Sequence, residues 1–365
     1  MNRRTFIYSG AVASATLALP RPGRLFASTS EAGWRTFEVT TRVEILNPTG
    51  ATYMWLPAAL LKNTRYQTTL SNTFQAEGGA AELVVNKDDD YGIVTAKFPE
   101  GVRPVLTLTS KVSTRDVAVD VTKPGRPPKA DSAELQKFLQ PTKMVPTDGV
   151  VKDQSASICL GISGDINKAR AIYEWIVDNT FRNPKTRGCG IGDIRFMLES
   201  KDLGGKCADL NALYVGLARA AGLPARHVYG LRIAKSDLGF KSLGPSTEVC
   251  TKGQHCRAEV YCDGYGWVPA DPADVRKVVL EEPPGNLPMD SEPVQKARKY
   301  LFGAWNMNWM AFNCGHDVAL PGSKLAPVNY FMYPQAETAE GRVDPFDADK
   351  FKYEITSKEL TSPTS

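Results

Sequence analysis

Between residues 34 and 121, hydrophobic side chains recur at every second position, a spacing typical of strands that bury one face. Segments rich in Asn, Asp, Gly and Pro, at 47–50 and 87–90, separate these runs as turns would. The sequence therefore predicts an antiparallel, Ig-like β-sandwich over residues 33–122. The pattern is clearest at Phe37, Val39, Val43, Ile45, Leu106, Leu108, Val117, Val119 and Val121.

The pattern changes after a proline-rich break at 123–128, which continues neither a sheet nor a helix. We expect residues 123–164 to be a linker region. Helical spacing follows at 166–180, with Asp165 as a candidate cap, and again at 207–221, where Gly222 and Pro224 supply a stop.

Strand patterns follow at 226–233, 255–262 and 267–271, with a turn at 263–266. Helices followed by a hairpin indicate an α+β fold, with a second domain at 165–280. We expect residues 281–365 to form a C-terminal extension that packs on the core through its aromatic segment, 300–312.

The first 27 residues have the features of an export signal. They begin with Arg3 and Arg4, continue with a short apolar run at 11–19 and end in small residues. The paired arginines resemble a twin-arginine (Tat) signal, and the run is shorter than the roughly 20 residues of a membrane span. We expect a signal peptide at 1–27 and a periplasmic or secreted protein without a membrane span after signal removal. The alternative is an uncleaved anchor.

Charge argues against a nucleic-acid partner. Lys and Arg together number 44 against 40 Asp and Glu, but four arginines lie in the predicted leader, which has no acidic residue. The rest of the chain has equal numbers of basic and acidic residues, so we expect no nucleic-acid binding. A local basic patch is still compatible with this composition.

Cys207 follows a Gly-Gly-Lys turn and occupies the first turn of a predicted helix. Free N–H groups and the helix dipole at such a position favour a thiolate and can bind an oxyanion. Lys206 would lower the pKa of the thiol further if its ammonium lies nearby, and it is a candidate substrate contact. The alternative is a buried cysteine that only fills the core.

A thiolate nucleophile needs a base that a third group orients, and the chain has three histidines. His255 opens one strand and Asp271 ends the next. If the hairpin loop has an odd number of residues, with Cys262 opposite Gly266, the side chains of His255 and Asp271 share one face. An even number would place them on opposite faces. His227 lies on an apolar strand and is interpreted as structural. His316 lies beside an acid in a small-residue segment and is a candidate substrate contact.

The stretches Gly205–Asp209, Leu223–Arg226, His255–Tyr261 and Gly266–Pro272 together resemble the transglutaminase-like superfamily in order and spacing. The resemblance covers about residues 166–279. It implies a papain-like core with a catalytic triad carried here by Cys207, His255 and Asp271. Arg257 stands where an aromatic residue often occurs, which leaves the substrate preference open. Glu259 and Trp267 are candidate site neighbours, each with a structural alternative on a half-buried strand.

Seven cysteines in an exported chain leave one unpaired, and Cys207 is the natural candidate for a free thiol. The others allow 15 disulfide connectivities, and some can remain reduced. A zinc site is disfavoured, because the spacing lacks C-x2-C pairs. The others are Cys159, Cys189, Cys250, Cys256, Cys262 and Cys314.

The function expected from these features is thiol-dependent attack on a peptide or carboxamide carbonyl. Water would make the protein a hydrolase, as a cysteine protease or amidase, and an amine would make it a cross-linking acyltransferase. We expect hydrolysis by default and a peptide or protein substrate, with cell-wall peptide as one candidate. No cofactor or metal is expected. The alternative is a catalytically idle periplasmic binding or scaffold protein.

Overall fold

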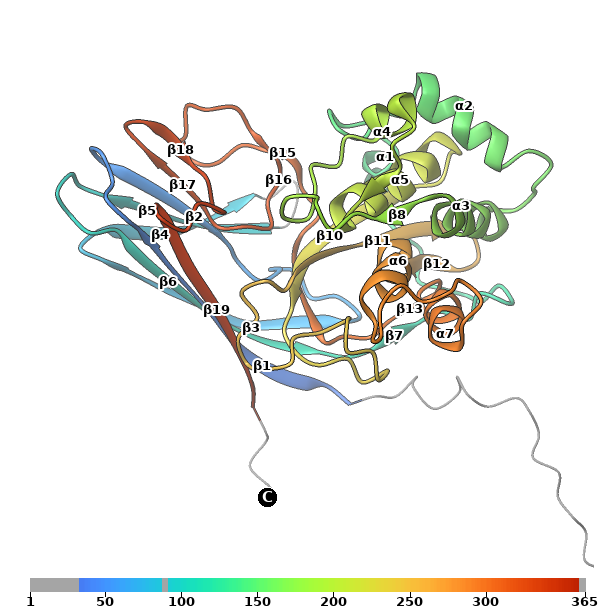
Figure 1. Ribbon diagram of the computed structural model, residues 1–365, viewed down its shortest axis with the longest axis horizontal. Coiled ribbons are helices and arrows are strands. Elements are labelled where there is room, and N and C mark those ends of the chain that lie inside the picture. Colours follow the sequence, from blue (N-terminus) through green and yellow to red (C-terminus); the bar gives the residue numbers. More distant parts are fainter. Residues whose placement is uncertain (1–32, 87–90, 361–365) are drawn as a thin grey trace, which may run out of the picture.

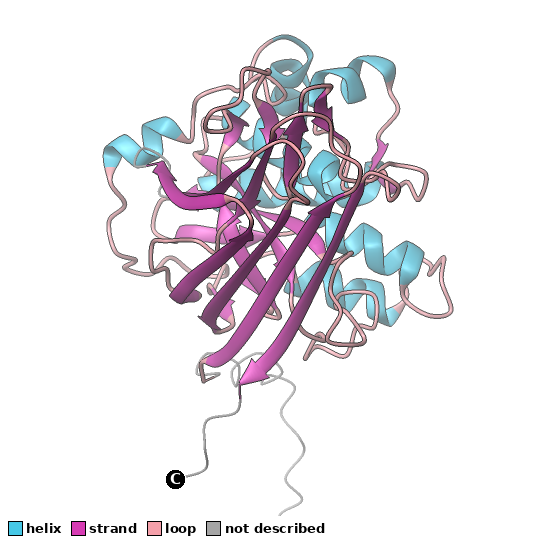
Figure 2. Ribbon diagram, turned by 90° about the vertical axis from the view of Figure 1, so that its left-hand side faces the viewer, coloured by secondary structure: helices cyan, strands magenta, loops and turns pink. Residues whose placement is uncertain are grey.

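The computed structural model describes residues 33–86 and 91–360, so the predicted signal peptide and the 87–90 turn lie outside the described residues. Its architecture is α+β, as the sequence predicts. In Figure 1, the strands of a sandwich gather on the left and helices surround a second sheet on the right. Figure 2, turned by 90°, brings the long strands of the sandwich to the front.

The sandwich consists of two antiparallel sheets that enclose one apolar layer. Alternate side chains of the strands, including Val43, Leu56, Val94 and Phe98, fill this layer. The first sheet runs β19 (Phe351–Leu360), β1 (Arg35–Ile45), β6 (Val105–Thr114), β3 (Gln67–Glu77). The second runs β18 (Gly341–Val343), β17 (Gln335–Thr338), β2 (Thr52–Pro57), β5 (Tyr91–Phe98), β4 (Ala80–Asn86).

The sandwich is not confined to residues 33–122. Strand β19 pairs antiparallel with β1 from Thr36↔Leu360 to Ile45↔Phe351, and β17 pairs with β2. Part of the predicted C-terminal extension therefore belongs to the sandwich sheets.

The rest of the chain forms what we call the helical half, residues 123–313. Its sheet runs β12 (Gly266–Ala270), β11 (Gln254–Cys262), β10 (Ala225–Arg232), β14 (Trp309–Asn313). The helices are α1 (Ser132–Lys137), α2 (Gly149–Ile158), α3 (Asp165–Asn179), α4 (Ile194–Ser200), α5 (Cys207–Ala220), α6 (Pro272–Glu281) and α7 (Glu292–Tyr300). The short strands of this half are β8 (Phe181–Arg182), β9 (Gly204–Gly205) and β13 (Ala304–Trp305). Outside it lie the short strands β7 (Val117–Ala118), β15 (His316–Val318) and β16 (Val328–Tyr330).

Helix α5 is the centre of the helical half. It is buried on all sides except at its last residue, because it is apolar nearly all round and packs on β10, β11 and several helices. Among these is α2, which lies in the stretch predicted as a linker. Helix α3 has Gly164 as its N-cap, so Asp165 is its first residue rather than its cap.

One apolar core joins the two halves. Phe37 and Val112 of the sandwich belong to the same buried cluster as the residues of α5. The aromatic segment 300–312 is also buried, and β14, which begins within it, is an edge strand of the sheet of the helical half. In the described parts of the chain, 33–86 and 91–360, no helix combines the length and apolar character needed to span a bilayer.

Candidate active site

The Cys207 side chain is buried at the first turn of α5, with 4% of its surface exposed. Strand β9 pairs in parallel with β8, and the chain then turns at Lys206, the N-cap, into the helix. The backbone N–H of Cys207 has no acceptor within the helix, as at any helix start. The position therefore offers a thiol next to a free N–H group and the positive end of the helix dipole.

Asp209 holds the loop that lies across this helix start. Its Oδ2 accepts a hydrogen bond from the N–H of Lys206 at 3.0 Å, and its Oδ1 accepts from the N–H groups of Ile191 and Gly192 at 3.0 and 2.9 Å. Gly190 (φ 92°) passes so close that an added Cβ would lie 1.8 Å from Asp209 Oδ2. The N–H of residue 208 donates to the Cys189 carbonyl at 2.9 Å, so the loop places Cys189 beside Cys207.

The β11–β12 hairpin brings His255 and Asp271 together. Cys262 pairs with Gly266, which confirms the odd loop, and His255 Nε2 lies 2.7 Å from Asp271 Oδ2. Because Nε2 is held by the carboxylate, Nδ1 is the ring nitrogen left to serve the Cys207 thiol, whose pKa His255 helps to lower. The sequence-predicted Cys, His and Asp therefore meet at one point.

Asp271 is itself fixed by three neighbours. It is the N-cap of α6, where its Oδ1 accepts from the N–H of Asp274 at 3.2 Å. The same oxygen accepts from Asn211 Nδ2 at 3.2 Å, and Asn211 also donates to the carbonyl of Cys256 at 2.8 Å. Arg257 Nε lies 3.7 Å from Asp271 Oδ2. The carboxylate is fully buried, so these contacts determine which way it points.

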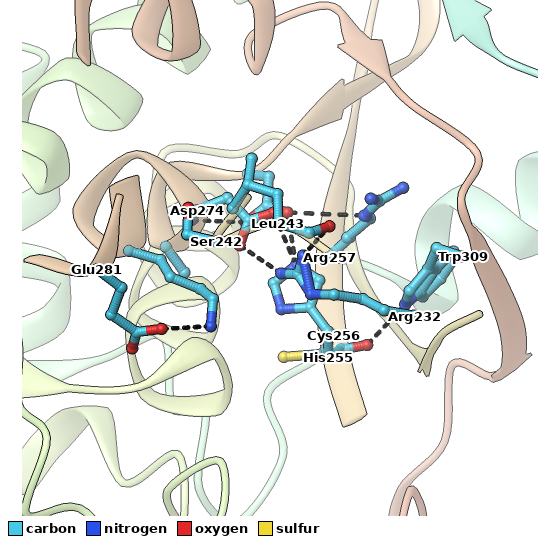
Figure 3. A network of polar contacts seen from close by, with 12 residues as sticks. Arg232, Ser242, Leu243, His255, Cys256, Arg257, Asp274, Glu281 and Trp309 are labelled. Atoms are coloured by element: carbon cyan, nitrogen blue, oxygen red, sulfur yellow. Dashed lines mark hydrogen bonds and ion pairs between the residues drawn. The ribbon is translucent and has the colours of Figure 1, made fainter. Parts of the chain in front are cut away.

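A second carboxylate, Asp274, lies behind the imidazole. Its Oδ2 is 3.4 Å from His255 Nε2, and its Oδ1 accepts from Arg232 Nη2 at 2.5 Å. Figure 3 shows His255, Asp274 and Arg232 in this network, with Trp309 donating to the backbone of His255. Burial works to lower the pKa of His255, as does Arg232, but Asp274 and Asp271 outweigh both and raise it.

Three thiols meet at the site. Hydrogen bonds from Cys189 and then Cys256, together with His255, lower the pKa of Cys207 well below its usual value despite burial. The pKa values of Cys207 and His255 thus move in opposite directions, which favours a thiolate beside an imidazolium. All seven cysteines, which lie within the described residues, are free thiols, so the disulfides expected from the sequence are not formed in this structure.

One group of side chains has the donor spacing of a metal site. One ligand atom from each of His255, Asp271 and Asp274 lies within 4.8 Å of the others. Two guanidinium groups, those of Arg232 and Arg257, already lie against these carboxylates, at 2.5 and 3.7 Å. Their positive charge occupies the place that a divalent cation would need, so the residues fit a charge network better than a metal centre.

The thiol opens into a cleft of about 760 Å³. Cys207, His255 and Lys206 line it, together with residues of the 242–254 loop and of the C-terminal segment 345–353. Lys206 therefore lies where the sequence places a substrate contact.

The other two candidate substrate contacts are elsewhere. Trp267 faces a second cavity of about 710 Å³, where Arg226 lies 4.1 Å from its ring. His316 stacks on His227 with ring centroids 5.4 Å apart, and its Nδ1 lies 3.3 Å from Thr142 Oγ1. Neither Trp267 nor His316 lines the cleft. Burial lowers the pKa of both histidines, to about 3 for His227, which suits a neutral, structural pair.

Sequence reasoning missed the groups that support the triad: Asn211, Asp274, Arg232, Cys189 and Cys256. Asp274 carried a usable signal, because it lies one helical turn after Asp271 and so faces the same histidine. Cys189 and Cys207 are eighteen positions apart, with α4 and β9 between them, and no periodic pattern indicates their contact.

Comparisons of the sequence and the fold with known proteins found several similar proteins. Residues 152–272 match the family model of the transglutaminase-like superfamily. An uncharacterized protein of Haemophilus influenzae (strain ATCC 51907 / DSM 11121 / KW20 / Rd) is 35% identical over 344 residues, 89% of this chain and 91% of that protein. The solved structure of a candidate cysteine protease from Cytophaga hutchinsonii has a TM-score of 0.56 at 16% identity, covering 92% of this chain and 93% of that one. The periplasmic domain of TgpA from Pseudomonas aeruginosa scores 0.35 at 16% identity, covering 66% and 88%.

Proposed function

Because the chain belongs to the transglutaminase-like superfamily, we propose that it is a thiol enzyme that acts on peptide or carboxamide bonds through an acyl-enzyme on Cys207. One observation carries the proposal. Cys207 and His255 line the same cleft, His255 Nε2 is held 2.7 Å from Asp271 Oδ2, and the proximity of His255 helps to lower the pKa of the Cys207 thiol.

The chemistry follows from these contacts. Cys207 Sγ attacks the carbonyl carbon, and its proton passes to His255 Nδ1. The N–H of Cys207 binds the oxyanion at the helix start. The imidazolium then protonates the departing amine as the C–N bond breaks, leaving a thioester. Asp271 fixes the ring throughout and stabilises its positive charge.

The thioester has two fates. Water, deprotonated by His255, gives a carboxylate and restores the thiol, whereas a primary amine gives a new amide. We propose hydrolysis as the main outcome, because water at bulk concentration competes with any amine and the cleft lining includes no Asp or Glu among the described residues to attract one. The competing proposal is an idle triad in a binding or scaffold protein, which the lowered pKa of Cys207 disfavours.

Two experiments test the proposal. The first labels Cys207 with iodoacetamide at graded pH. An ordinary thiol reacts with a midpoint near ~8.5, and we expect the midpoint for Cys207 to lie well below that value. Cys207→Ala is the control that identifies the labelled site. A midpoint at the ordinary value would contradict the thiol mechanism.

The second experiment separates the two fates of the thioester. The protein is incubated with a glutamine-containing peptide and a labelled primary amine, and amine incorporation is compared with ammonia and cleaved peptide. We expect hydrolysis products to dominate. Predominant incorporation at modest amine concentration would make the protein a transferase and leave the thiol mechanism intact.

A further inference from the structure

We propose that the cleft at Cys207 selects acidic peptides, and that its lysines bind carboxylates on either side of the scissile amide. The inference rests on the proposed function for its chemical step, but the binding it describes requires no turnover.

The lining of the cleft is rich in basic side chains. Six basic side chains line it, and none of the lining residues, all within the described ranges, is Asp or Glu. They are Arg182, Lys206, Arg232, Lys252, Lys277 and Lys352. The excess is local, because the chain outside the predicted leader has equal numbers of acidic and basic residues.

Carboxylates behind the lining neutralise only part of this charge. Arg232 pairs with Asp274, while Arg182 and Lys277 share the single carboxylate of Glu281. Within the part of the chain that the structure describes, Lys206, Lys252 and Lys352 make no ion pair. Six cations therefore face two carboxylates, and three of the cations remain available to a ligand.

The positive charges in the cleft also repel one another. Burial, followed by the charges of Arg232 and Arg182, lowers the pKa of Lys277. An anion bound in the cleft would relieve this repulsion, because it would place a negative charge among positive charges that the fold already holds in fixed positions.

The remaining wall indicates a peptide rather than a nucleic acid. Phe346, Phe351 and Tyr353 line the side formed by the C-terminal segment. An apolar wall opposite fixed cations suits a chain that carries both carboxylates and apolar groups. The thiol, moreover, attacks acyl carbons, which a peptide offers and a phosphodiester does not.

The positions of the lysines locate the carboxylates. Lys206 directly precedes Cys207, and Lys252 lies three residues before His255, so both stand close to the reacting carbonyl. A Glu or Asp side chain and a free C-terminal carboxylate offer the same chemistry here. The experiment distinguishes these two sources.

Binding is measured on the full chain carrying Cys207→Ala, which prevents turnover. Fluorescence anisotropy compares a glutamate-rich peptide containing one glutamine with its all-glutamine isostere, each with a free and an amidated C-terminus. We expect the glutamate peptide to bind about tenfold tighter at low salt, with the difference largely lost near ~0.5 M salt, where surface charges are screened. Loss of the preference on amidation alone would assign the site to a terminal carboxylate.

Two double variants test the lysines. Lys252→Gln with Lys352→Gln should reduce the preference to about twofold or less. Lys152→Gln with Lys324→Gln removes the same charge outside the cleft and should leave the preference unchanged. Equal binding of both peptides, or a preference that survives in the cleft variant, would overturn the inference. Equally tight binding of a single-stranded oligonucleotide would replace peptide selection with general anion binding.

The two proposals fail separately. Selective binding by the Cys207→Ala protein, combined with no turnover by the unmodified protein, leaves the acidic specificity standing and removes the enzyme. Turnover of the all-glutamine peptide with no preference for the glutamate peptide would leave the enzyme activity standing and remove the acidic specificity.

Discussion

At the residue scale, His255 Nε2 faces two carboxylates, those of Asp271 and Asp274, and both raise the proton affinity of the ring. The negative charge of Asp274 contributes to raising the pKa of His255. In the proposed mechanism the imidazolium donates a proton to the leaving amine, so we expect activity to fall as pH rises through this pKa.

Asp274→Asn should therefore move the alkaline limb of the pH profile of kcat/KM to lower pH, because it removes a charge that stabilises the imidazolium. The amide oxygen still accepts from Arg232, so the fold should persist. Asp148→Asn, at an exposed ion pair, is the matched control. An alkaline limb that does not move would show that Asp274 has no influence on the proton affinity of His255.

The thiols around Cys207 permit a second test at this scale. Cys189 is the largest influence that lowers the pKa of Cys207, and the Tyr333 hydroxyl donates to its sulfur at 3.0 Å. Cys189→Ala should raise the pKa of Cys207 and slow its alkylation near neutral pH. Cys262→Ala removes an equally buried thiol from the far end of β11 and should leave the alkylation profile unchanged. Coincident profiles for the two variants would refute the assigned influence of Cys189.

At the element scale, Asp209 joins the start of α5 to the loop that carries Cys189. It accepts three backbone N–H groups, in one buried and two part-buried hydrogen bonds, and truncation would remove the acceptor from all three. We expect Asp209→Ala to lower the free energy of unfolding in urea by about 3 kcal/mol. It should also slow the alkylation of Cys207, because Cys189 would no longer be held beside it. A variant with unchanged stability would show that water replaces the carboxylate.

The same elements show how far the sequence predicts the site. The helix start at Cys207 and the register of the β11–β12 hairpin depend on residues close in the chain, so spacing alone predicted that Cys207 begins a helix and, given an odd loop, that His255 and Asp271 share a face. The placement of Cys189, the burial of His316 and the distance of Trp267 from the cleft depend on which segments pack together in space. β19 and β1 are also far apart in the sequence, and no local pattern in β19 predicts that it pairs with β1.

At the scale of the whole molecule, the shared core predicts a single unfolding transition. Ile355 of β19 is 3% exposed, belongs to the core that contains Cys207, and bonds through its backbone to Cys250 and Thr251 in the loop before His255. Ile355→Ala should lower the free energy of unfolding by about 2–5 kcal/mol. Val85→Ala, on an exposed edge position, should stay within about 0.5 kcal/mol.

The measurement follows near-UV circular dichroism and the protection of Cys207 from alkylation along one urea titration. Both signals should shift together in Ile355→Ala, because the sandwich and the helical half share their interior. Two separated transitions would show that the halves unfold independently.

The pairing of β1 with β19 also determines when the first sheet and the cleft can form during synthesis. Residues 36–45 emerge among the first during synthesis, but their partners, 351–360, emerge among the last. Until then one edge of the first sheet has no neighbour, and the wall of the cleft formed by Phe351 and Tyr353 does not exist. A nascent chain that already contains Cys207, His255 and Asp271 thus lacks the groove that would present a substrate to them. We therefore expect a nascent chain that stops before residue 351 to offer a substrate only an incomplete cleft.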